Sequence, residues 1–492
     1  MPRTSKNCPC SIGVMRVLKK KNTDSTEFDW TENRMTYDEF LEKKEIVIEN
    51  SGFEVEDSQL SPFLFDFQKD IVRWALRKGK VALFEDTGLG KTIQQLQWAT
   101  LVAEHTERPV MIFAPLRVSK QTVLEGNKFN LPVNLCESQE DVIQGVNITN
   151  YEKIHKFDTD TFRGVVLDES SILKSYSGKT TQDMINRFRF TPYKLRCTAT
   201  PSPNDYTELG NHAEFLNVMT MNEMLSMYFI NDSSHGMGWR LKGHSRDEFF
   251  KWIREWAMMI KSPADFGFDG SQFELPKLNI INEIVESPHT DENRLFVVPR
   301  ETLTERRTAR KDSLSNRVQR TLEIIENNHI ENCIIWCNFN DESDALSKAI
   351  PNAYEVKGSD TDEHKEKGMI GFATGDVKYL VTKPSICGFG MNWQNCNNMI
   401  FCGLSDSFEQ FYQAIRRCYR FGQKKEVNVY VITSEAEENV LNNIKKKQEN
   451  HEMMSKAMMK LLSVISREKL YSLKYNRTNY RPQEEIKMPK WL

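Results

Sequence analysis

The sequence lacks any hydrophobic segment long enough for a membrane. No apolar run approaches the ~20 residues needed to span a bilayer. The first residues also lack the apolar core of a secretory signal peptide, so we expect a cytoplasmic protein with no membrane partner. A global excess of basic charge is missing too, because the formal net charge is −3. A nucleic-acid partner would therefore meet local basic faces and not a uniformly basic molecule.

Cysteines are scattered and show no disulfide framework. There are 10 of them, and such a framework is unusual in so long a chain, so we expect a reducing environment. Four lie in apolar runs and are predicted to be small buried side chains: Cys197, Cys333, Cys337 and Cys402. Cys8-Pro9-Cys10 is reminiscent of half a metal site, but no second pair with ligand spacing follows it. A disordered tail is the preferred interpretation, with zinc as the alternative.

Short apolar runs alternate with helix-like segments in two successive blocks. Strands are expected at residues 81–84, 110–113, 145–149, 165–168, 195–198 and 276–286, and then at 333–337, 379–382, 399–402 and 427–432. Strands separated by helices predict parallel, doubly wound sheets, so the fold class is α/β. The expected parts are a basic disordered segment at 1–35, a first lobe at 36–290 with a helical protrusion at about 205–261, a second lobe at 291–440 and a basic helical tail at 441–492.

The segment Glu85-Asp86-Thr87-Gly88-Leu89-Gly90-Lys91-Thr92 resembles a phosphate-binding loop. It follows an apolar strand and opens a helix, so backbone N–H groups and the helix N-terminus favour an anion. Lys91 is expected to reach the β- and γ-phosphates of ATP, and Thr92 to hold Mg²⁺. The strict pattern has glycine where Glu85 stands, and the alternative is a glycine cap followed by a chance Gly-Lys-Thr. The cofactor-binding residues expected here are Thr87, Gly88, Gly90, Lys91 and Thr92.

Two acids and two arginines complete the candidate catalytic set. Val165-Val166-Leu167-Asp168-Glu169 is an apolar strand that ends in acids, and ligands bind at the carboxyl ends of parallel strands. Asp168 is expected to hold the Mg²⁺, and Glu169 to polarise the attacking water. Arg417 and Arg420 are three apart, so we expect them on one helical face. Such arginines stabilise charge on the γ-phosphate; the alternative is a pair of surface arginines.

These residues resemble helicase superfamily two, and within it the Swi/Snf-like branch of double-stranded-DNA translocases. The resemblance covers roughly residues 36 to 440 and extends to short forms from bacteriophages and prophages, often described as DEAD/DEAH-box helicases. It assigns Gln68 to adenine recognition and adds Gly390 and Gln413 to the expected cofactor-binding residues. The matching segments are Phe67-Gln68-Lys69, Asp86 to Thr92 (motif I), Ala114-Pro115-Leu116 (motif Ia), Asp168-Glu169-Ser170-Ser171 (motif II), Thr198-Ala199-Thr200-Pro201 (motif III), Trp336 to Phe339 (motif IV), Gly388 to Asn392 (motif V) and Gln413 to Gln423 (motif VI).

The resemblance implies two RecA-like lobes that hydrolyse ATP with Mg²⁺ and move along DNA, mainly duplex and without sequence preference. It also suggests phage replication, recombination or defence proteins as partners, in a bacterial host cytoplasm. Two alternatives stay within the motor class: an RNA or branched-DNA remodelling helicase, and the motor subunit of a restriction or defence complex. A third is a binding protein with a degenerate ATPase. The intact candidate catalytic residues argue against it: Lys91, Asp168, Glu169, Arg417 and Arg420.

Overall fold

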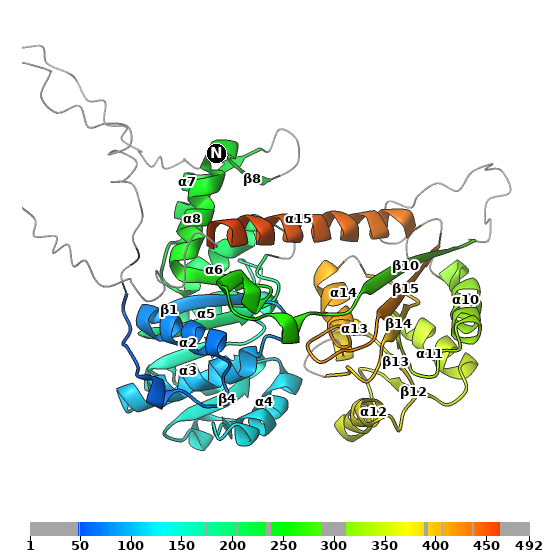
Figure 1. Cartoon of the computed structure of the whole chain (residues 1–492), viewed down its shortest axis with the longest axis horizontal. Coiled ribbons are helices and arrows are strands. Elements are labelled where there is room, and N and C mark those ends of the chain that lie inside the picture. The colour runs from blue at the N-terminus through cyan, green and yellow to red at the C-terminus, as the bar shows by residue number, and fades with distance from the viewer. Residues whose placement is uncertain are drawn as a thin grey trace, which may run out of the picture. The chain divides into compact units, whose positions relative to one another are not determined.

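The computed structural model describes residues 48, 50–173, 175–202, 205–232, 238–286, 311–387, 392–405, 407–434 and 437–462 (Figure 1). All of them belong to one structural unit. Three expectations lie wholly or largely outside these residues: the 1–35 segment with Cys8 and Cys10, most of motif V with Gly390, and the end of the 441–492 tail. No helix in the described ranges is long and apolar enough to cross a membrane.

The first sheet consists of seven parallel strands in the order β3-β4-β2-β5-β6-β1-β9. Every residue of β2, β4, β5 and β6 is buried, as expected where helices cover both faces of a parallel sheet. The strands are β1 (Lys80–Glu85), β2 (Val110–Ala114), β3 (Asn134–Leu135), β4 (Val146–Asn150), β5 (Gly164–Leu167), β6 (Tyr193–Thr198) and β9 (Ala257–Ile260).

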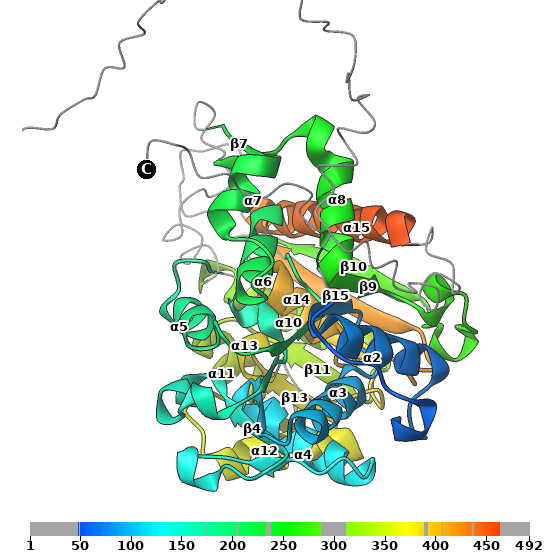
Figure 2. The ribbon, with the colours of Figure 1, turned by 90° about the vertical axis from the view of Figure 1, so that its left-hand side faces the viewer.

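Helices with one apolar face pack on this sheet. In α2 the buried residues Phe67, Ile71 and Trp74 recur at helical spacing and join the same core as α3. Figure 2 shows α2 and α3 side by side. The helices are α2 (Asp66–Lys78), α3 (Lys91–Thr106), α4 (Leu116–Lys128) and α5 (Lys179–Arg187).

The helical protrusion is present, but it is not helical throughout. It contains α6 (Leu209–Phe215), α7 (Met221–Tyr228), α8 (Arg246–Trp256) and a hairpin of β7 (Phe229–Asn231) and β8 (Trp239–Leu241). The prediction was wrong for its last residues, because β9 is a strand that pairs with β1. Trp252 and Trp256 are buried there, whereas Trp239 on the hairpin is 39% exposed.

The second sheet has six parallel strands in the order β10-β15-β14-β11-β13-β12. The strands are β10 (Leu278–Val285), β11 (Cys333–Trp336), β12 (Ala353–Val356), β13 (Tyr379–Thr382), β14 (Asn398–Phe401) and β15 (Val427–Ser434). The helices are α10 (Leu314–Asn327), α11 (Asn340–Ala349), α12 (Asp362–Thr374), α13 (Pro384–Cys387), α14 (Phe408–Ile415) and α15 (Glu438–Leu462). The predicted α/β class, with two doubly wound parallel sheets, is therefore confirmed.

One expected boundary between the lobes was wrong. The strand expected at 276–286 falls within the predicted first lobe, but β10 pairs with β15 along its whole length, from Leu278 beside Val427 to Val285 beside Ser434. Its partner lies 149 residues further along the chain, so no local pattern shows which sheet it joins. The connection between the two sheets therefore lies before Leu278.

Helix α15 connects elements of both sheets. It contacts α8 and β9 on the side of the first sheet, and α14 and β15 on the side of the second. Its buried side chains include Val440, Ile444 and Met454. The described part of the expected tail is thus helical and packed against both lobes.

Candidate active site

The phosphate loop lies between the end of β1 at Glu85 and the start of α3 at Lys91. Gly88 and Gly90 have φ values of +93° and +79°, a region that side chains rarely adopt. A Cβ atom on Gly88 would lie 2.8 Å from the backbone nitrogen of Phe421, and one on Gly90 2.3 Å from Gln68 Nε2. Only glycine therefore fits at these two turns, and the backbone N–H groups at the start of α3 remain open to an anion.

Lys91 is held over the loop by the loop's own carbonyl groups. Its Nζ donates to the Glu85 oxygen at 2.8 Å and to the Asp86 oxygen at 3.1 Å. Thr92 is half-buried in the first turn of α3, and the buried Thr87 Oγ1 forms no hydrogen bond within the described protein. This combination of a cation, an oriented helix N-terminus and free hydroxyl groups fits a bound nucleoside triphosphate and its magnesium ion.

Gln68 lies against the loop, where both ends of its amide form hydrogen bonds with backbone groups, and its predicted role in adenine recognition stays a prediction. Its Nε2 donates to the Leu89 oxygen at 2.7 Å, and its Oε1 accepts from the Phe65 N–H at 2.9 Å. The side chain is buried at the start of α2. Gln68 therefore connects α2 to the phosphate loop, which places it beside any nucleotide bound there.

Asp168 and Glu169 follow β5 at the same edge of the sheet. Asp168 Oδ1 accepts from Gln95 Nε2 at 2.8 Å and from the Glu169 N–H at 3.0 Å, and burial raises the pKa of this carboxyl. Burial, followed by the charge of Asp168, raises the pKa of Glu169 to about 7, and Lys91 and Arg417 oppose that rise. Glu169 Oε2 is buried and accepts no hydrogen bond within the described protein. Glu169 is thus a carboxyl of this site that can exchange a proton near neutral pH.

Arg417 and Arg420 lie beyond the end of α14, which stops at Ile415. The prediction that they share a helical face was wrong, because the chain leaves the helix and enters a turn. Arg417 donates from Nε to the Gln413 oxygen at 3.1 Å and from Nη2 to Gln413 Oε1 at 3.0 Å. Burial and then Arg420 lower its pKa to about 10, against the attraction of Glu169.

Burial also lowers the pKa of Arg420, and Glu125 and Glu169 oppose this. The two arginines of the second lobe and the acid after β5 therefore act on one another electrostatically. Gln413 holds Arg417 in this arrangement, and the catalytic roles of Arg417, Arg420 and Glu169 stay a prediction.

A contact that the sequence analysis missed joins the phosphate loop to the second lobe. Asp86 accepts from Tyr412 at 2.6 Å and from Arg416 Nη2 at 2.5 Å. Burial opposes ionisation of Asp86, but Arg416 and Tyr412 hold its pKa below the usual range. The guanidinium of Arg416 also lies over the rings of Tyr412 and Tyr419, at 5.1 and 5.2 Å from their centroids. Asp86 lies more than 300 residues before Tyr412 and Arg416, so no local spacing in the sequence predicts this contact.

Aromatic rings add to this junction. Phe421, the neighbour of Gly88, stacks on Phe273 with ring centroids 4.7 Å apart.

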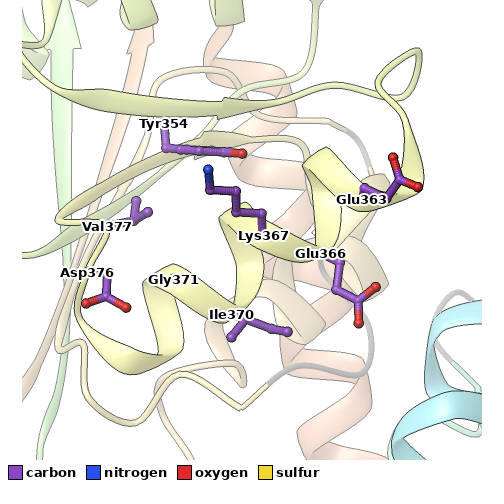
Figure 3. A pocket seen from close by; sticks show the side chains of 8 residues that line it. All are labelled: Tyr354, Glu363, Glu366, Lys367, Ile370, Gly371, Asp376 and Val377. Atoms are coloured by element: carbon purple, nitrogen blue, oxygen red, sulfur yellow. The ribbon is translucent and has the colours of Figure 1, made fainter.

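A separate surface hollow of about 440 Å³ lies beside α12, where Lys367 reaches toward Tyr354 (Figure 3). None of the predicted site residues lines this hollow, so the candidate active site is the one built on the phosphate loop.

Known proteins match both halves of this arrangement. The SNF2-related domain model matches residues 67–231, and the helicase conserved C-terminal domain model matches residues 316–422. The SWI/SNF-related matrix-associated actin-dependent regulator of chromatin subfamily A-like protein 1 is 26% identical in Xenopus tropicalis and 25% identical in Xenopus laevis, each over 219 residues. Those matches cover 42% of this chain but only 23% and 22% of the two relatives.

A solved structure, the Sulfolobus solfataricus SWI2/SNF2 ATPase core in complex with dsDNA, aligns with 85% of this chain and 98% of its own. The TM-score is 0.40 and the sequence identity is 19%. The predicted phage origin is not addressed by any of these matches and stays a prediction. The two family models, one on each parallel sheet, show that the chain belongs to the Swi/Snf-like branch of helicase superfamily two, a family of ATPases.

Proposed function

We propose that this protein hydrolyses ATP with Mg²⁺ in a site completed by both lobes, and that DNA stimulates the reaction. The observation that carries the proposal is the junction of the two lobes at the phosphate loop, where Asp86 accepts from Tyr412 and Arg416, and where Glu169 lies within electrostatic reach of Lys91 and Arg417. A buried carboxyl, a phosphate-loop lysine and an arginine from a second lobe are the parts that phosphoryl transfer to water requires.

Each residue has a task that follows from its position. The loop glycines and the start of α3 bind the phosphates, and Lys91 compensates their charge. Thr92 and Asp168 would hold the magnesium ion, which neutralises charge on the β- and γ-phosphates when bound. Glu169, with its pKa near 7, orients the attacking water and accepts its proton. Arg417 and Arg420 stabilise the charge that develops on the γ-phosphate.

The energy of this reaction would drive movement along DNA. The support is membership in the Swi/Snf-like branch, together with a junction that ties the phosphate loop directly to the second lobe through Asp86 and Arg416. A change at the γ-phosphate can thereby change the relation between the lobes. We propose duplex DNA as the main track, held through its phosphates, so that binding is sequence-tolerant and sensitive to salt. Phage replication, recombination or defence proteins remain the proposed partners.

Parallel ATPase assays with duplex DNA, single-stranded DNA, forked DNA and RNA test the proposed track. We expect the largest stimulation with duplex DNA. Stronger stimulation by RNA or by forks would favour a remodelling helicase. Stimulation by none of the four would contradict a nucleic-acid motor and leave the ATPase without an assigned track.

The Glu169→Gln variant tests the chemistry. The amide keeps the shape of the side chain but cannot accept the proton, so we expect ATP to bind with little change and to be hydrolysed at least about 100-fold more slowly, within the usual range for general-base loss. Turnover at the wild-type rate would contradict the role of Glu169.

A further inference from the structure

The backbone at Glu169 has an unusual conformation. Its φ is +47°, in the left-handed region that residues other than glycine rarely adopt. Such conformations persist only where the surrounding structure holds them, and they gather at active sites. Glu169 has no hydrogen-bond partner on Oε2 within the described protein. The orientation of its carboxylate therefore depends on the backbone conformation at Glu169, and groups that hold this backbone also hold the carboxylate in place.

Two side chains from outside motif II hold the carbonyl groups of the residues before and after Glu169, namely Asp168 and Ser170. The Tyr151 hydroxyl donates to the Asp168 oxygen at 2.7 Å, and Arg196 Nη2 donates to the Ser170 oxygen at 2.9 Å. Tyr151 follows β4 and Arg196 lies on β6, the neighbour of β5 in the sheet. One side-chain hydrogen bond thus holds the residue before Glu169, and another holds the residue after it.

Both side chains are themselves fixed. They are almost completely buried, with 2% of Tyr151 and 1% of Arg196 exposed. Arg196 Nη1 donates to the Asn211 oxygen of α6 at 2.7 Å, and its guanidinium lies 5.5 Å from the centroid of the Phe215 ring. Removing a guanidinium from water is costly. A buried arginine whose guanidinium donates to backbone carbonyl groups therefore indicates that the backbone of this turn is held rigidly.

We propose that Tyr151 and Arg196 are positioning residues for ATP hydrolysis, which hold the carbonyl groups flanking Glu169 so that its carboxylate stays aimed at the attacking water. The inference rests on the proposed function, because it takes Glu169 as the group that accepts the proton. The hydrogen bonds of both side chains go to backbone carbonyl groups outside the phosphate loop, so we expect each residue to act through the orientation of Glu169. Their loss should therefore slow the chemical step and leave ATP affinity unchanged.

Tyr151→Phe is the sharpest test, because it removes one hydroxyl from a buried ring. Tyr379→Phe is the matched control, since the Tyr379 hydroxyl donates to the Ile330 oxygen, also at 2.7 Å, on the second sheet away from the site. In steady-state ATPase assays with the most stimulating nucleic acid, we expect Tyr151→Phe to lower kcat about three- to tenfold, as for the loss of one hydrogen bond. KM for ATP should change less than twofold, and Tyr379→Phe should alter neither constant. An unchanged kcat in Tyr151→Phe would overturn the inference.

A double-mutant cycle with Glu169→Gln shows whether Tyr151 acts through Glu169. In that background, Tyr151→Phe should have no further effect on the residual rate, because the group that it positions is gone. An equal fold-loss in both backgrounds would mean an independent role and would contradict the inference. If Glu169→Gln itself hydrolyses ATP at the wild-type rate, the proposed function fails and not only this inference.

Arg196→Lys and Arg196→Met extend the test to the other side of the turn. Lysine keeps the charge and one donor, so we expect it to recover part of the kcat that methionine loses, at similar KM. Equal kcat values in the two folded variants would contradict positioning by Arg196. If Arg196→Met does not fold, Arg196→Lys is compared with wild type. A lowered kcat at similar KM supports positioning by Arg196, because lysine does not reproduce both bonds of the guanidinium, and an unchanged kcat contradicts it.

Discussion

Glu85 offers a test of how the phosphate loop is built. It stands where a strict phosphate loop has glycine, and its carboxyl is fully buried next to Lys91, with Oε2 accepting from Gln94 Nε2 at 2.9 Å. Burial raises its pKa from 4.5 to about 7, although Lys91 and Gln94 oppose the rise. Glu85→Gln replaces this carboxyl with a neutral group of almost the same shape that can still accept the bond from Gln94.

The expected effect depends on pH, and its sign follows from the direction of the shift. Because the folded pKa of Glu85 exceeds the unfolded value, its contribution to stability is fully present below pH 4.5 and is lost as the pH rises through about 7. The difference between those two pKa values corresponds to roughly 3 kcal/mol at pH 8. The variant lacks this loss, so it should be more stable than wild type at pH 8 by up to about that amount, and by no more than about 1 kcal/mol at pH 5.

Denaturant unfolding at pH 5 and pH 8 measures this difference. Glu366→Gln on the surface of α12 is the control, because that side chain is exposed and its replacement should change stability equally at both pH values. The free energy of unfolding of Glu85→Gln, relative to wild type, should increase between pH 5 and pH 8. A gain that is equal at both pH values, or a loss at pH 8, would refute the argument from the buried carboxyl.

Two further variants probe other contacts of the loop. Lys91→Ala should remove most ATP binding, measured with a fluorescent nucleotide, because it deletes the charge that faces the β- and γ-phosphates; binding at wild-type affinity would contradict its role. Arg416→Ala should lower the free energy of unfolding by about 3 kcal/mol, because it leaves the mostly buried Asp86 without its cation. The Asp86→Asn/Arg416→Gln double variant should recover much of the lost free energy of unfolding, because it leaves no unpaired charge. If it recovers none, the unpaired charge of Asp86 is not the cause of the lower stability.

Much of the fold was predictable because its signals are local. The runs around β1, β2 and β5 are apolar on both faces, as expected for a parallel sheet covered by helices. The loop from Glu85 to Thr92 was recognisable because glycine, lysine and threonine must stand at fixed offsets from a strand end. The buried cysteines were also predicted correctly: Cys197, Cys333, Cys337 and Cys402 all lie in the core.

The errors arose where the outcome depends on partners distant in sequence. Ala257–Ile260 is a short apolar run that suits either a buried helix or a strand, and only pairing with β1 decides. The edge strands β3 and β12 were missed because they are short and only partly buried. The spacing of Arg417 and Arg420 predicted a shared helical face, but α14 ends at Ile415, and Arg417 is held by Gln413 instead.

The most direct test of the account is the hydrolysis rate of the Arg417→Ala/Arg420→Ala double variant. Arginines supplied across a cleft contribute about 10³–10⁵ in rate elsewhere. We expect a loss at the low end of that range, measured as single-turnover ATP hydrolysis with saturating duplex DNA. ATP binding should persist, because the phosphate loop lies in the other lobe. A double variant that binds ATP and hydrolyses it at the full DNA-stimulated rate would contradict a catalytic site completed by both lobes.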